Sequence, residues 1–97
     1  MAPVLFRQAA RADFDAIVEF IASDNPDRAF TFVDELEEAC LRLGEFPDKA
    51  PLVPSLGLDI RRLIHGTYNI YYRHESGRVI ILRVLHAAKL VDRNDVT

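Results

Sequence analysis

Two stretches in the first half of the chain carry apolar residues at the spacing of an amphipathic helix. In residues 8–22 the apolar positions recur three or four residues apart, and Asp13, Asp15 and Glu19 are expected to point outward. Residues 26–43 repeat the pattern, with an apolar stripe formed by Ala29, Phe30, Val33, Leu36, Cys40 and Leu43. The pattern predicts two helices with a very short connection, which must fold back on each other as an antiparallel hairpin.

The connection and the far end of this hairpin have residues typical of helix termini. A residue before proline resists the helical conformation, so the first helix should end before Asn25 and Pro26. Asn25 is then the N-cap of the second helix and Pro26 its first residue. Gly44 follows the second helix, where we expect the left-handed conformation that glycine adopts easily at a helix end.

The second half of the chain predicts a sheet. Three runs rich in β-branched and aromatic residues are separated by Gly66 and Gly77, and they span residues 60–65, 68–74 and 78–86. A short β-prone run at residues 4–6 needs this sheet as a partner, and the proline-rich residues 45–58 form a crossing loop. The expected fold is α+β, with a short N-terminal strand, the helical hairpin and a three-stranded antiparallel meander that forms one small sheet packed on the hairpin. We expect one domain over residues 1–97.

The alternation of side chains along a strand assigns each residue to one face of the sheet. In the middle strand one face is expected to carry Tyr68, Ile70 and Tyr72, and the other Asn69, Tyr71 and Arg73. In the last strand one face is expected to carry Ile80, Leu82, Val84 and His86, and the other Val79, Ile81, Arg83 and Leu85. The middle strand therefore reads as half-exposed. The hairpin covers one face of the sheet, and we expect the other face to be open and concave.

Charge divides the chain into an acidic and a basic half. The net charge is -3, but residues 1–57 carry 5 basic and 11 acidic side chains, whereas residues 58–93 carry 7 basic and 3 acidic ones. This asymmetry fits either a surface for an anionic partner or ordinary solvated faces. A single cysteine, Cys40, excludes an internal disulfide, and with three scattered histidines it offers no ligand set for zinc. Since no apolar run is long enough to span a membrane and no secretion signal is expected, we expect a cytoplasmic protein.

No complete catalytic motif is present in the chain. It has no Ser-His-Asp arrangement, no glycine-rich phosphate loop and no His-x-x-x-His pair. A metal-free nuclease would need cations to stabilise the phosphate and a general acid and base, and the candidates are Arg61, Tyr71, Arg83 and His86. The alternative is structural: Arg61 and Arg62 pair with helix carboxylates or face solvent, His86 is hydrogen-bonded, and Tyr71 lies in the core. Arg83 is the hardest to dismiss because it lies in an apolar strand, where a guanidinium must be paired.

Several short motifs carry information beyond the fold. They are Ile21-Ala22, Asn25-Pro26 and Ala29 in the hairpin, Arg61 at the first meander strand, the run Tyr68-Asn69-Ile70-Tyr71-Tyr72-Arg73, and Arg83-Val84-Leu85-His86 near the end. In this order they resemble the RelE/ParE superfamily of bacterial toxins from type II toxin-antitoxin systems, over a span from Val4 to about Arg93. The last two motifs look more like the ParE branch than the RelE branch.

The resemblance implies a function that depends on the branch. RelE-like members cleave messenger RNA in the ribosome with several lysines and arginines and a tyrosine near the C-terminus. This chain has no tyrosine after His86, Lys49 is the only lysine before the sheet, and a net charge of -3 suits a ribosomal RNA surface poorly. ParE-like members lack the nuclease set and are understood to inhibit DNA gyrase. The resemblance therefore implies a toxin that inhibits DNA gyrase and is not an enzyme.

Two alternatives stay open. The first is a RelE-like ribosome-dependent mRNA endoribonuclease that uses Arg61, Arg83 and His86. The second is a degenerate, non-toxic protein that persists only as a binding partner of its antitoxin.

The resemblance also implies a cognate, ParD-like antitoxin that wraps the hairpin and the sheet. An apolar groove along the hairpin would take an amphipathic helix, and an exposed sheet edge would take an added strand. The residues expected to contact the antitoxin are Phe14, Ile17, Ile21, Phe30, Val33, Arg61, Arg73 and Arg83. The residues expected to contact the target are Arg83, His86, Lys89 and Arg93. We expect no cofactor, no metal, no membrane association and no direct DNA binding.

Overall fold

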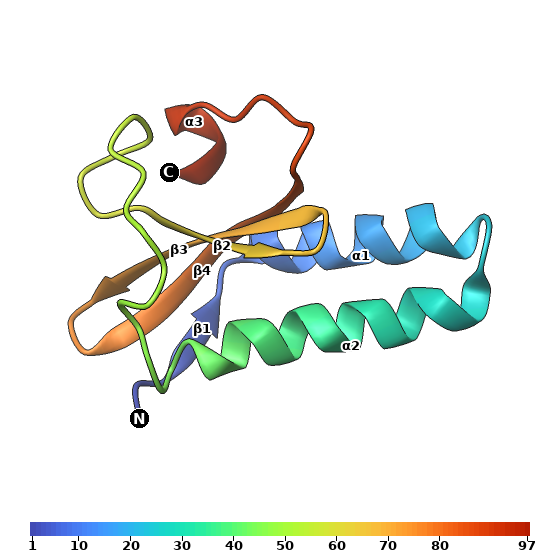
Figure 1. Ribbon diagram of the computed structural model, residues 1–97, viewed down its shortest axis with the longest axis horizontal. Coiled ribbons are helices and arrows are strands. Elements are labelled where there is room, and N and C mark those ends of the chain that lie inside the picture. Colours follow the sequence, from blue (N-terminus) through green and yellow to red (C-terminus); the bar gives the residue numbers. More distant parts are fainter.

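The helical hairpin has the bounds that the sequence predicts to within one residue. In the computed structural model, which describes residues 1–97, helix α1 spans Gln8–Ala22 and helix α2 spans Pro26–Arg42. The two helices run antiparallel side by side (Figure 1). Asn25 caps α2, because its side chain accepts a hydrogen bond from the backbone N–H of Arg28 at 3.1 Å. Neither helix is long and apolar enough to cross a membrane.

Four strands form one sheet beside the hairpin. They are β1 (Val4–Phe6), β2 (Arg61–His65), β3 (Tyr68–Glu75) and β4 (Arg78–His86), arranged in the order β1-β4-β3-β2. The pairs β2–β3 and β3–β4 are antiparallel, as expected of a meander, and β1 adds to β4 in parallel. Gly66 and Gly77 take the positive φ angles of the two tight turns. The predicted α+β fold is confirmed, with a short C-terminal helix α3 (Arg93–Val96) in addition.

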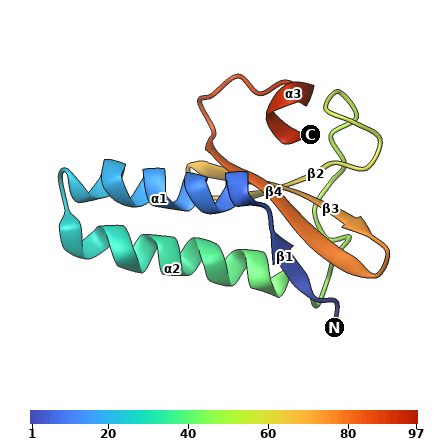
Figure 2. The same cartoon turned by 180° about the vertical axis from the view of Figure 1, so that it is seen from behind.

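Each face of the sheet has its own core. The face toward the hairpin packs into a cluster of 13 buried residues that includes Phe14, Leu36 and Tyr72. The opposite face holds a second cluster of 7 buried residues, which includes Tyr71 of β3, Leu56 of the crossing loop and Val96 of α3. Figures 1 and 2 show the loop and α3 together on the side of the sheet away from the hairpin. The expectation of an open concave face was therefore wrong, as was that of a half-exposed β3, whose first five residues are buried.

A β-bulge in β4 overturns the predicted alternation. Tyr71 pairs with Arg83 but Tyr72 pairs with Ile81, so Leu82 is an extra residue of β4 that has no partner in β3. After this residue the alternation of side chains between the two faces of the sheet is shifted by one position. As a result Val84 joins Val79 and Ile81 in the core under the hairpin, while Ile80, Leu82 and Leu85 share the second core. The sequence pattern had placed Val84 with Ile80 and Leu82, because a prediction from strict alternation does not account for an inserted residue.

Two details of α2 also differ from expectation. Phe30 was placed in the apolar stripe but is 65% exposed, and Phe32 packs against the core instead. Gly44 does not adopt a positive φ. A Cβ atom at Gly44 would lie 2.5 Å from the backbone oxygen of Ala2, whose N–H donates to the Gly44 oxygen at 2.8 Å. Glycine is required here by the close approach of the N-terminal segment, and not by a left-handed helix end.

Candidate functional site

Arg83 is the most firmly held of the predicted site residues. Its Nε donates to Asp13 Oδ2 at 2.7 Å and its Nη2 to Asp13 Oδ1 at 2.8 Å, which is a bidentate ion pair. Its Nη1 donates to the backbone oxygen of Asp95 in α3 at 3.1 Å. The hydrogen bond with Asp13 raises the pKa of Arg83. Arg83 thus joins α1, β4 and α3, and each of its three guanidinium nitrogens donates one hydrogen bond within the protein.

Asp13 has a second role at the edge of the sheet. Strand β1 ends at Phe6, and beyond it no strand lies beside β4 on that side. The Val84 N–H at this open edge donates to Asp13 Oδ2 at 2.9 Å, so the carboxylate replaces the missing strand. Asp13 is 11% exposed. The expectation that Asp13 points outward was wrong, and sequence reasoning missed it as the partner that Arg83 needs.

Arg61 belongs to a different set of contacts, between the sheet and the crossing loop. It donates through Nη1 to the backbone oxygens of Ala50 at 2.7 Å and Asp48 at 3.2 Å, and Nη2 lies 3.4 Å from Asp48 Oδ1. His74 Nδ1 lies 2.9 Å from the same carboxylate oxygen. This hydrogen bond with His74, followed by the charge of Arg61, lowers the pKa of Asp48. The expectation that Arg61 pairs with helix carboxylates was wrong, since its partners lie in the loop.

Tyr72 completes the attachment of the loop. Its hydroxyl donates to the backbone oxygen of Pro47 at 2.8 Å and accepts from the Ala50 N–H at 3.4 Å. Burial raises the pKa of Tyr72. The contacts of Asp48, Tyr72 and His74 could not be predicted from the sequence, because their partners come from segments far away along the chain.

The three residues of the endoribonuclease alternative, Arg61, Arg83 and His86, are each bound to different neighbours. Arg61 binds the loop and Arg83 binds Asp13. His86 is exposed, accepts a hydrogen bond at Nδ1 from the Ala88 N–H at 3.0 Å, and packs edge-on against Tyr68. No group of three or more His, Cys, Asp or Glu side chains is arranged to hold a metal ion.

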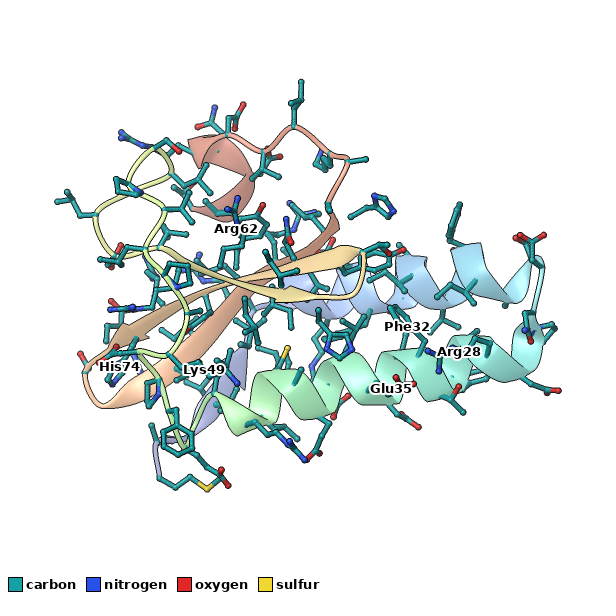
Figure 3. All side chains as sticks on the ribbon, viewed as in Figure 1. Arg28, Phe32, Glu35, Lys49, Arg62 and His74 are labelled. Atoms are coloured by element: carbon teal, nitrogen blue, oxygen red, sulfur yellow. The ribbon has the colours of Figure 1, made fainter.

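A groove of about 520 Å³ lies between α2 and strand β2. Nine residues line it: Asp34, Glu35, Glu38, Ala39, Arg42, Lys49, Leu63, Ile64 and His65. Figure 3 shows Glu35 on α2 and Lys49 on the loop along this side of the molecule. Two ion pairs brace the α2 wall, because Glu35 binds Arg28 and Glu38 binds Arg42.

Strand β2 is an edge strand of the sheet, and only its first part is covered. The loop pairs with it through hydrogen bonds from Val53 N–H to the Ile60 oxygen and from Arg62 N–H to the Pro51 oxygen. From Leu63 to His65 no further strand lies beside it. Ile64 at this uncovered end is 66% exposed. The groove therefore combines an open sheet edge with apolar side chains and groups of both charges.

The other predicted antitoxin contacts are scattered. Phe14 and Ile17 are buried in the core, so their expected place on a docking surface was wrong. Ile21 and Val33 are partly buried against the same core, whereas Phe30 is exposed. Arg73 is half-buried, forms an ion pair with Glu75 at 3.4 Å, and leaves its buried Nε without a partner. Lys89 and Arg93, expected to contact the target, are exposed in the C-terminal segment.

Comparison with known proteins decides the family. The model of the "ParE toxin of type II toxin-antitoxin system, parDE" matches residues 4–91. The chain belongs to the ParE toxin family. It is 31% identical over 90 residues to "Toxin RelE2" of Caulobacter vibrioides, a match that covers 93% of this chain and 100% of that toxin. Membership in the RelE/ParE superfamily is thus confirmed.

Solved structures agree with the ParE assignment at the level of the fold. The chromosomal ParDE toxin-antitoxin system from P. aeruginosa contains a chain with a TM-score of 0.79 and 22% identity, covering 89% of this chain and 96% of that one. The toxin-antitoxin complex RelBE2 from Mycobacterium tuberculosis contains a chain with a TM-score of 0.65 and 28% identity, covering 88% of this chain and 96% of that one. The fold is therefore found in chains of both a ParDE system and a RelBE2 complex.

Proposed function

We propose that this protein is the toxin of a type II toxin-antitoxin module, that it inhibits DNA gyrase by binding and not by catalysis, and that a ParD-like antitoxin neutralises it in the cytoplasm. The proposal that the protein acts by binding and not by catalysis rests on the contacts of Arg83. A nuclease would aim this guanidinium at a substrate phosphate. Here its donors are directed at Asp13 and Asp95. The match of residues 4–91 to the ParE family supports the role as a toxin, and gyrase as the target is what the resemblance to ParE-like members implies.

The groove between α2 and β2 supports a place for the antitoxin. An extended segment that adds to the edge at Leu63–His65 would gain backbone hydrogen bonds, and its alternate side chains would enter the groove. Asp34 and Glu38 on one wall and Lys49 on the other favour a segment that carries both charges. Two relatives of known structure come from toxin-antitoxin systems, which supports a partner of this kind.

A variant of Ile64 tests the groove as the antitoxin site. Ile64→Asp places a charge on the uncovered edge, and we expect it to weaken antitoxin binding at least tenfold in a titration. Leu58→Asp is the matched control, because Leu58 is 96% exposed and is not a lining residue of the groove. Equal binding by both variants would place the antitoxin elsewhere.

Induction of the protein without its antitoxin tests the function in cells. We expect filamentation and a DNA-damage response with transcripts intact, and rescue when the antitoxin gene is induced together with it. The name of the Caulobacter relative, RelE2, keeps the ribosome-dependent endoribonuclease as a second candidate. That activity would give cleaved transcripts soon after induction. Unaffected growth would instead favour a degenerate protein that only binds its antitoxin.

A further inference from the structure

We infer that helix α1 carries a contact surface for a second copy of the same chain, and that two α1 helices pack antiparallel across a two-fold axis. The surface, termed the outer face of α1, consists of four exposed apolar residues: Ala9, Ala12, Ala16 and Phe20. It is separate from the groove between α2 and β2, because no lining residue of that groove comes from α1. The role of the outer face does not depend on the proposed function.

Helix α1 has apolar residues on two of its faces. One face is buried and includes Ala10, Phe14 and Ile17, which pack in the core under the hairpin. Residues three or four positions apart lie on the same side of a helix, so the exposed positions 9, 12, 16 and 20 form one row along α1. Figure 2 shows α1 from a side on which no other segment of the chain lies over it. A surface helix needs only one apolar face to pack on its own core, so the second row indicates a partner.

Phe20 is the anchor of the outer face. Its side chain is 71% exposed, the highest value for a large apolar side chain in either helix of the hairpin. Aromatic side chains are enriched in the buried centres of protein interfaces. The other three positions of the outer face are alanines, whose small side chains allow a second helix to approach closely. The outer face therefore suits a helix as its partner.

The spacing along the outer face is self-complementary. When two copies of α1 run antiparallel about an axis midway between Ala9 and Phe20, each Phe20 lies level with Ala9 of the second copy. Ala12 then lies nearly level with Ala16 of the second copy. The large ring at one end of the row thus meets the smallest side chain of the other end, twice in each dimer. Because both chains use the same surface, the contact closes at two copies.

The charges of α1 favour a second copy in the antiparallel orientation. The first turn of α1 has no acidic residue, and its last turn has no basic one. Arg7 before the helix, Glu19 near its end and Asp24 after it are all exposed and form no ion pair. Antiparallel packing places Arg7 of each chain at the acidic end of the other helix, whereas parallel packing would bring like charges together. It also sets the positive end of each helix dipole beside the negative end of the other.

The size of the contact limits its strength. Standard protein interfaces bury about 1,600 Å² in total, and one row on each of two 15-residue helices buries less than that. We therefore expect a reversible dimer with a dissociation constant on the order of 10–100 µM. Since the groove between α2 and β2 receives no residue from α1, it stays open in both chains of the dimer.

Sedimentation equilibrium of the purified full chain tests the contact, at concentrations from about 5 to 500 µM on either side of the expected dissociation constant. We expect the average mass to rise from that of one chain toward that of two and to go no higher. The mass of a single chain at all concentrations would overturn the inference. Growth beyond two chains would also overturn it, because it indicates a head-to-tail contact that does not close.

Substitutions decide whether the outer face is responsible. Phe20→Asp should weaken the dimer at least tenfold, because it removes the anchor and places a charge in the contact. Phe30→Asp is the matched control, since Phe30 is 65% exposed but lies on α2, outside the outer face. Ala16→Glu, which keeps a good helix former at an exposed position, serves if Phe20→Asp does not fold. Equal dimerisation of Phe20→Asp and Phe30→Asp would contradict the assignment to α1.

A charge exchange tests the orientation of the two helices. Arg7→Glu and Glu19→Lys should each weaken the dimer about threefold, because each places like charges next to one another. The double variant Arg7→Glu with Glu19→Lys should regain the native affinity, since the exchanged charges again meet their opposites across the axis. Losses that add in the double variant would exclude the antiparallel contact.

Discussion

Arg83→Gln should destabilise the protein strongly, because the pair of Arg83 and Asp13 holds α1, β4 and α3 together. The substitution removes two bonds to the Asp13 carboxylate and one to the Asp95 oxygen. It leaves a carboxylate that is 11% exposed, with only the Val84 N–H as a donor. Breaking a buried pair in this way costs about 3–5 kcal/mol. Since the Arg83 side chain is 25% exposed, we expect about 3 kcal/mol, the lower end of that range.

Urea unfolding measures this loss. A domain of this size has a stability of about 5–15 kcal/mol, and with an m value of about 2 kcal/mol/M the midpoint should fall by about 1.5 M. Arg78→Gln is the control, with a change within about 0.5 kcal/mol. The double variant Asp13→Asn with Arg83→Gln should lose clearly less than the two single losses together, because no unpaired buried charge remains. A midpoint unchanged in Arg83→Gln would refute the structural role and return Arg83 to the candidates for substrate contact.

Three further predictions concern individual groups. Tyr72→Phe should lower the free energy of unfolding by about 1–2 kcal/mol, because the Pro47 oxygen loses its hydrogen-bond donor. Burial raises the pKa of Tyr72, so the folded state holds the phenol proton more tightly than the unfolded state does. The free energy of unfolding of the native chain should therefore fall as the pH rises above about 10. In Tyr72→Phe the fall should be smaller. His74→Ala should raise the pKa of Asp48 toward its usual value, which carboxyl NMR measures. Because a lowered carboxyl pKa makes the protein lose stability below about pH 4, this loss should be smaller in His74→Ala. Burial raises the pKa of Cys40 to about 12, so iodoacetamide at pH 8 should label it only as fast as the protein unfolds; prompt labelling of the native chain would show an accessible thiolate.

The helices could be predicted from the sequence because their signals are local. The apolar spacing gave the extents of α1 and α2, and Asn25 with Pro26 placed the boundary between them. The turns at Gly66 and Gly77 were equally local, because each needs a positive φ. These features depend on residues a few positions apart, which is the range over which a sequence pattern is informative.

The site could not be predicted in the same way, because its contacts join distant segments. Asp13 and Arg83 are 70 residues apart in the chain, and neither residue indicates the other. The extra residue at Leu82 reverses the faces of the strand after it, and nothing in its apolar neighbours marks the bulge. Arg62 was expected to pair with a helix carboxylate or to face solvent, but it is half-buried in a cavity that includes residues of the segment after β4. Only the need to pair a guanidinium in an apolar strand pointed toward Arg83.

The most direct test of a gyrase-directed toxin that is not an enzyme is a supercoiling assay with the purified chain, freed from its antitoxin. At stoichiometric excess over DNA gyrase we expect supercoiling to stop, and addition of the antitoxin to restore it. The same preparation, added to translating ribosomes, should leave messenger RNA intact. Unimpaired supercoiling together with cleaved messenger RNA would contradict the proposal and identify the protein as an endoribonuclease.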